Sequence, residues 1–134
     1  MTKFMLLQNY EGGAGCTEPI TNWAPEDIHA HIAFQQALNK ELLDSGELVD
    51  AQGLAGPDLA KKVTYAGAGA PVVTDGPFPE VKELLAGYRM IDVESEARAI
   101  EIAARASAAP GPNGVPIQQP IEVRQVMGAP DGDL

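Results

Sequence analysis

The side chains best suited to chemistry are a carboxylate at a sharp turn and two histidines on a predicted helix. The carboxylate is Asp75, which follows a short apolar run and precedes Gly76 and Pro77. An aspartate at such a turn commonly accepts a hydrogen bond from the backbone N–H two residues on, but here that residue is a proline without an N–H. The carboxylate must therefore reach the N–H of Phe78 or beyond, or point away from its own backbone. If it points away, it is available as a general base or as an anchor for a ligand.

The same turn also suits a purely structural role. Asp75 would then cap the turn and Phe78 would anchor it in the core. Gly76 would supply the extended or special conformation that a residue before proline adopts. The local sequence rules leave both roles open.

The two histidines, His29 and His31, are two positions apart on a predicted helix, so they point to different sides and cannot form a paired metal site. His31 lies three residues from Ile28 and from Phe34, close to the apolar side of that helix, whereas His29 is expected to face solvent. His31 is therefore either a packing residue or a proton-transfer group, since imidazole exchanges protons near neutral pH. If it meets Asp75 in space, the two form a candidate pair of catalytic base and orienting group.

Other residue types that could take part in chemistry give weaker indications of a site. Cys16 is the only cysteine and has no recognisable base partner, so a free loop thiol is expected. The glycines at positions 12, 13 and 15 lack the spacing of a phosphate-binding loop, and the sequence predicts no metal and no cofactor. Arg89 suits an anionic ligand, but the sequence favours a surface or interface ion pair for it.

Composition limits the classes of partner. The chain has 134 residues, 45% of them hydrophobic, which is enough for one globular domain without disulfides. The formal net charge of −10 argues against nucleic acid or an anionic membrane as the partner. The longest apolar runs are too short for a membrane span or a signal-peptide core, and a cytoplasmic protein is expected.

Periodicity predicts the elements that position these side chains. Two amphipathic helices are expected, the first opened by Pro25 after a poor N-cap at Ala24 and ended by Ser45 and Gly46. A proline-led short helix is expected to begin at Pro79. The predicted long helices span residues 25–44 and 94–107, and the predicted strands span residues 3–8, 47–51, 61–66, 70–74, 87–93 and 121–126.

Two finer predictions concern the last strand before the second long helix and that helix itself. In the strand, Tyr88, Met90 and Asp92 are expected on one face and Arg89, Ile91 and Val93 on the other. In the helix, the buried stripe is expected to consist of Ala97, Ile100, Ala103 and Ala104, and Glu101 is expected to pair with Arg105.

The order of elements predicts an α+β fold. Two βα-containing halves with interposed strands indicate a ferredoxin-like split βαβ sheet with two helices on one face. The other face of the sheet then needs a cover, for which too few apolar elements remain, so a homodimer is expected. Residues 1–127 are predicted to form the single domain and residues 128–134 a loose tail.

The sequence also resembles a known family. DGPFPEVKE at residues 75–83, followed by LLAGYRMIDV, resembles the DGPF proteins of the YCII-related family, as do KFMLLQ at residues 3–8, SGELVDAQGL at 45–54 and IEVRQVM at 121–127. The resemblance implies a ferredoxin-like domain that pairs into a dimeric α/β barrel. It also implies a candidate active site of an Asp with a His. Asp75 matches the motif directly, and His31 is placed by analogy. One relative acts as a dehydrochlorinase, whereas most members have no assigned activity.

Two functional hypotheses follow. In the first, the protein is a cofactor-free isomerase or lyase for a small organic molecule, with Asp75 as base and His31 as its partner or acid. In the second, it is a non-catalytic accessory or ligand-binding module in which the DGPF turn is structural.

Overall fold

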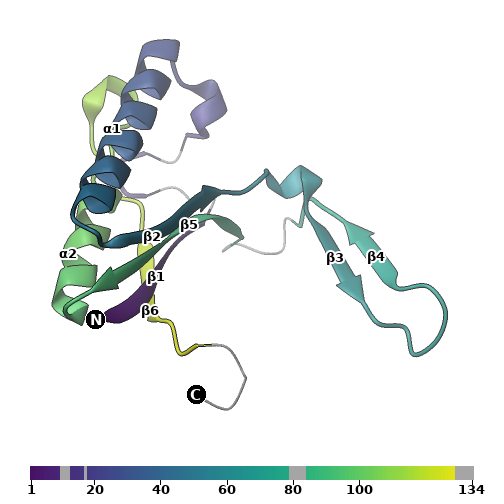
Figure 1. Ribbon diagram of the computed structural model, residues 1–134. Helices are drawn as coiled ribbons and strands as arrows, with labels where there is room; N and C mark the ends of the chain where they lie inside the picture. The colour runs from purple at the N-terminus through teal and green to yellow at the C-terminus, as the bar shows by residue number, and fades with distance from the viewer. Residues whose placement is uncertain (10–12, 17, 79–83, 129–134) are drawn as a thin grey trace.

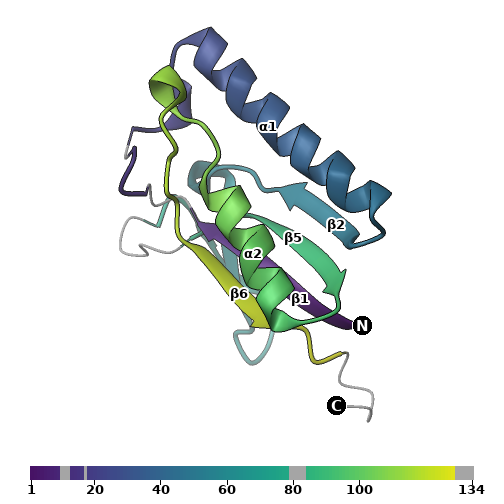
Figure 2. The same ribbon diagram turned by 90° about the vertical axis from the view of Figure 1, so that its left-hand side faces the viewer.

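A four-stranded antiparallel sheet with two helices on one face forms the body of the protein (Figure 1, Figure 2). The spatial strand order is β2-β5-β1-β6, which is that of a ferredoxin-like split βαβ fold, so the predicted fold class is confirmed. The helices are α1 (Pro25–Asp44) and α2 (Glu96–Ser107), and the strands of this sheet are β1 (Thr2–Asn9), β2 (Leu48–Gly53), β5 (Leu85–Val93) and β6 (Ile121–Gln125).

This computed structural model describes residues 1–9, 13–16, 18–78 and 84–128. The short helix predicted to begin at Pro79 lies outside the described residues. So does the predicted tail beyond residue 128.

Helix α1 has the predicted bounds. Pro25 occupies its first turn, and the preceding Ala24 makes no side-chain cap, as expected from its residue type. Gly46, which follows the C-cap, adopts a φ of 79°, a left-handed conformation that suits glycine. Leu38 and Leu42 are buried against the sheet, whereas Ile32 is 44% exposed.

Helix α2 starts two residues later than predicted and buries a different stripe. The Ser95 hydroxyl caps it by accepting a hydrogen bond from the Arg98 N–H at 3.1 Å. Ile100, expected in the core, is 55% exposed, so the predicted stripe was wrong apart from Ala103. The buried positions are Ala99, Ile102, Ala103 and Ala106.

The core lies between the helices and one face of the sheet. Phe4 and Leu6 of β1 lie opposite Ile91 and Arg89 of β5, and all four are buried. The predicted alternation of β5 is confirmed, since Arg89, Ile91 and Val93 are buried on the helix side while the intervening residues are half-buried. Among the described residues of the sheet, Arg89 is thus the one buried residue with a charged side chain.

A two-stranded hairpin projects from the body between β2 and β5 (Figure 1). It consists of β3 (Lys61–Thr64) and β4 (Val72–Asp75), and every residue of the two strands is exposed. At its base Gly76 donates a hydrogen bond to the Ala60 carbonyl at 2.7 Å, and a Cβ at Gly76 would lie only 2.0 Å from the Pro57 carbonyl oxygen. Glycine is therefore required there by the close approach of two backbone segments.

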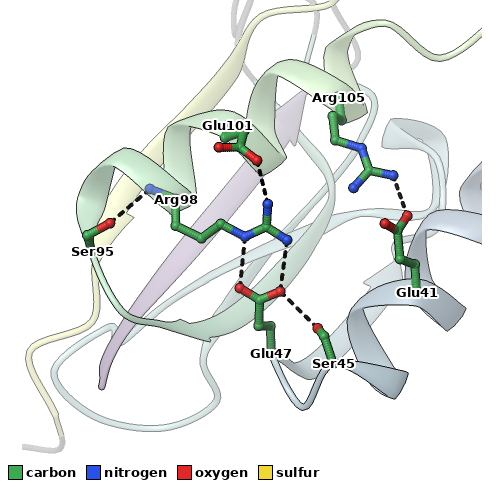
Figure 3. A network of polar contacts seen from close by, with 7 residues as sticks. All are labelled: Glu41, Ser45, Glu47, Ser95, Arg98, Glu101 and Arg105. Atoms are coloured by element: carbon green, nitrogen blue, oxygen red, sulfur yellow. Dashed lines mark hydrogen bonds and ion pairs between the residues drawn. The ribbon is translucent and has the colours of Figure 1, made fainter.

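Ion pairs join the two helices and the loop after α1 (Figure 3). The Arg98 guanidinium donates two hydrogen bonds of 2.9 Å to the Glu47 carboxylate, which also accepts one from the Ser45 hydroxyl at 2.8 Å. The predicted pair of Glu101 with Arg105 was wrong: Glu101 accepts from Arg98, and Arg105 donates to Glu41 of α1. The partner of Arg105 lies on the facing helix, which rules based on spacing within one helix do not reach, whereas Glu101 pairs at i,i+3 instead of i,i+4.

We expect Glu47→Gln to lower the free energy of unfolding by roughly 1 to 2 kcal/mol at pH 7, because it removes a charge-assisted fork of hydrogen bonds. Hydrogen bonding to Arg98 lowers the pKa of Glu47 below its ordinary 4.5. A carboxyl group with a depressed pKa stabilises the fold above its unfolded pKa, and this stabilisation disappears as the pH falls through the folded pKa.

Urea unfolding of wild type and Glu47→Gln at pH 7 and pH 3 measures this effect. The difference between the two proteins should shrink at the lower pH. Glu101→Gln serves as the control, because that side chain is 64% exposed and should cost much less. An equal difference at both pH values would show that charge plays no part.

Candidate functional site

A polar cavity of about 270 Å³ lies between α1 and the β2–β5 side of the sheet. Helix α1 contributes His31, Gln35 and Asn39, whose spacing of four residues places them on one side of the helix. Gly53 and Gly87, which also line the cavity, are cross-strand neighbours in β2 and β5 and carry no side chains. The remaining lining residues are Gln8, Ala51, Gln52, Ala86, Tyr88 and Arg89.

Arg89 is a buried cation on the wall of this cavity. Its side chain is held by two neutral amides of α1: Nε donates to Asn39 Oδ1 at 2.7 Å, and Nη2 donates to Gln35 Oε1. Arg89 as a whole is only 6% exposed, and no described carboxylate lies within ion-pair distance of it. Burial lowers the pKa of Arg89 below its ordinary value, yet a guanidinium stays charged in proteins.

His31 lies on the same wall in a defined tautomer. Its Nδ1 is 3.0 Å from the Pro110 carbonyl oxygen, which can only accept, so Nδ1 carries the proton. Its Nε2 is therefore the unprotonated nitrogen and accepts a longer hydrogen bond of 3.4 Å from the Gln35 amide. The chain of hydrogen bonds from Arg89 through Gln35 to His31 and Pro110 is consistent only with this tautomer of neutral His31.

Two further contacts fix the surroundings of His31 and Arg89. The Trp23 ring stands edge-on to the His31 ring, with centroids 5.4 Å apart. On the face of β5 opposite to Arg89, the Tyr88 hydroxyl donates to Asp50 Oδ2 at 2.9 Å. This hydrogen bond lowers the pKa of Asp50 and raises the pKa of Tyr88, because it favours the carboxylate and the protonated phenol.

Asp75 occupies a different part of the chain, at the base of the exposed hairpin. Its side chain is 72% exposed and accepts a hydrogen bond from Lys61 Nζ, its cross-strand neighbour, at 2.7 Å. The carboxylate thus points away from its own turn, while Phe78 is buried, as expected. Asp75 lines none of the described cavities, and no described hydrogen bond or ion pair joins it to His31. The structure of one chain does not bring the two predicted residues together.

The other candidates, His29 and Cys16, do not line this cavity. His29 is exposed, as predicted. Cys16 and Trp23 line a second cavity of about 550 Å³, where the Trp23 Nε1 donates to the Glu18 carbonyl at 3.0 Å and so holds the loop before α1. Within the described ranges there is no group of three or more His, Cys, Asp or Glu side chains that could hold a metal ion. No helix among the described residues is long and apolar enough to cross a membrane.

The sequence did contain a signal for Gln35 and Asn39, which were missed, and for their position next to Arg89. Gln35 and Asn39 continue the row of His31 along α1, which marks a polar stripe next to the apolar one. Arg89 has the same strand phase as Ile91 and Val93, which places a charge on the core side of β5. The combination of a polar helix stripe with a buried-phase arginine predicts a polar cavity under that helix.

Comparison with known proteins gives two matches. A family model for the YCII-related domain matches residues 3–115. An uncharacterized protein of Rhizobium meliloti is 30% identical over 118 residues, which cover 87% of this chain and 90% of that protein. Neither description names a ligand or a reaction.

Proposed function

This chain belongs to the YCII-related family, and from that premise we propose that it binds a small organic molecule in the polar cavity between α1 and β5. The observation that supports the proposal is the placement of an unprotonated His31 nitrogen and a buried Arg89 cation on one wall of a cavity of about 270 Å³. Concave sites with a few convergent polar groups are the usual places where small molecules bind.

In the enzymatic form of this proposal, the protein is a cofactor-free isomerase or lyase and His31 Nε2 is the base. The hydrogen bond from His31 Nδ1 to Pro110 fixes the ring, which is what a positioned base requires. The bond from Gln35 to Nε2 is long enough, at 3.4 Å, for a substrate proton to replace it. Asp75 joins this site only if a second copy of the chain supplies it.

A second copy is part of the proposal. Met5 and Met90 lie opposite each other on the face of the sheet that no helix of the described residues covers, and both are only half-buried. Val63, Val72 and Val73 of the projecting hairpin are also exposed. A homodimer that covers these apolar surfaces would form the dimeric α/β barrel that the resemblance to the family implies.

One observation favours a non-catalytic binding module as the second candidate. Lys61 takes up the Asp75 carboxylate, and the neighbouring Gly76 and Phe78 are held by backbone contact and burial. In this version the DGPF turn holds the hairpin in place and takes no part in chemistry.

The test is a thermal-stability screen of small neutral and charged organic compounds against four proteins. Compounds that raise the melting temperature of wild type are expected to lose that effect in His31→Ala and to keep it in His29→Ala, because only His31 lines the cavity. Hits that stabilise all variants equally would place the ligand elsewhere and refute the proposal.

Asp75→Asn, the fourth protein, separates the two candidate functions. Because its ion pair with Lys61 is exposed, this variant should keep the fold. Dimerisation of Asp75→Asn, measured by analytical ultracentrifugation, then decides between the two candidate functions. Loss of the dimer in Asp75→Asn supports the structural role of the turn, whereas an intact dimer with unchanged ligand binding leaves the carboxylate free for chemistry.

A further inference from the structure

We propose that the ligand of the polar cavity carries a single carboxylate group and that this group pairs with the Arg89 guanidinium. The inference rests on the proposed function, in which a small molecule occupies the cavity, and adds the chemical class of that molecule.

Arg89 has no counter-ion among the described residues. Arg89 is 6% exposed, and its described partners are the side-chain oxygens of Gln35 and Asn39, which are neutral. Buried charges in proteins are as a rule paired with an opposite charge, because desolvation is costly. A ligand carboxylate would supply the charge that the described part of the chain lacks.

The arrangement of hydrogen bonds around the Arg89 guanidinium also favours a carboxylate. Asn39 accepts from Nε and Gln35 from Nη2, so Nη1 makes no hydrogen bond with any residue that the structure describes. The end of the guanidinium formed by Nη1 and the second Nη2 hydrogen therefore has N–H donors that no described residue uses. Two parallel N–H groups of this kind match the two oxygens of a carboxylate. The amides of α1 orient the fork without neutralising it.

The charge and the volume of the cavity both favour a small monoanion. Arg89 is the only lysine or arginine among the lining residues, so the cavity offers one positive charge, which matches a monoanion better than a phosphate dianion. Its volume of about 270 Å³ is below the roughly 300 to 1,000 Å³ of typical ligand pockets. A small monocarboxylic acid fits both limits.

The test compares carboxylates with their neutral amides at constant ionic strength. Acetate and benzoate are titrated against the protein by isothermal calorimetry, with acetamide, benzamide and inorganic phosphate as the comparison ligands. At least one of the two carboxylates is expected to bind roughly 10- to 100-fold more tightly than its amide, the range expected for charge-assisted hydrogen bonds.

Three variants locate the binding charge. Arg89→Gln should remove this preference, whereas Arg124→Gln, which changes the net charge equally at a 69% exposed side chain, should retain it. Gln35→Glu covers the case in which Arg89→Gln fails to fold. It places a carboxylate of the same shape against Arg89, so it should keep the fold and still abolish carboxylate binding.

The outcomes distinguish this inference from the proposed function. If amides bind as tightly as carboxylates and require His31, the carboxylate inference fails while the proposed function stands. If phosphate binds more tightly than either carboxylate in an Arg89-dependent way, the carboxylate class is wrong. If neither carboxylates nor amides bind at the cavity, this inference and the proposed site both fail.

Discussion

Replacing Leu42 with alanine is expected to lower the free energy of unfolding by roughly 3 to 5 kcal/mol. Leu42 is fully buried and belongs to the cluster in which α1, α2 and the sheet meet, together with Ile91 and Ile102. Truncation there removes apolar contacts and leaves a cavity that the surrounding sheet and helices can fill only in part. Urea unfolding followed by circular dichroism measures the loss.

Leu43 provides a matched control one position along the same helix. It is 63% exposed, so Leu43→Ala should change the free energy of unfolding by less than about 0.5 kcal/mol. The two variants differ only in which side of α1 is truncated. A comparable loss in both would mean that Leu43 is covered in solution, for instance by a second copy of the chain.

Local signals made α1 and β5 predictable from the sequence. Pro25 at the start and Gly46 after the end defined α1, because each residue has a backbone preference that fits one position at a helix end. The strict alternation of β5 identified its two faces, since the side-chain period of a strand is fixed at two. The ferredoxin-like strand order then followed from the sequence of elements.

The phase of α2 was not predictable in the same way. Alanines occupy both its buried and its exposed sides, for example Ala99 and Ala104, so hydrophobicity alone does not mark the core side. Ser95 determined where the helix begins, and packing against the sheet selected the stripe containing Ile102. Tertiary contacts decided what the local pattern left open.

The contacts of the site residues were likewise not predictable from local sequence patterns alone. The turn chemistry of Asp75 left open whether its carboxylate reaches the N–H of Phe78 or points away, and the cross-strand position of Lys61 decided where it points. The cavity depends on Arg89 and on α1 residues about 50 positions earlier in the chain, Gln35 and Asn39. Such distant neighbours follow from topology, and topology is available only once the helix is placed over the correct sheet face.

Arg89→Met is expected to make the ligand-free protein more stable, by roughly 1 to 4 kcal/mol in the free energy of unfolding. In the absence of ligand the fold buries a guanidinium whose described partners are two neutral amides. Methionine has a similar length and is flexible enough to fill the same space without desolvating a charge. Gln35 and Asn39 line the cavity, so water can replace the hydrogen bonds that they lose.

Urea unfolding in carboxylate-free buffer, with Arg124→Met as the exposed control, measures this gain. Binding sites often retain groups that destabilise the empty protein, because ligand binding uses them. A more stable Arg89→Met that no longer binds carboxylates would show that Arg89 is kept at a cost to the fold for recognition. A less stable Arg89→Met would instead show that the guanidinium holds α1 on the sheet through Gln35 and Asn39. The cavity would then be a structural hydrogen-bond network, and the carboxylate site would lose its main support.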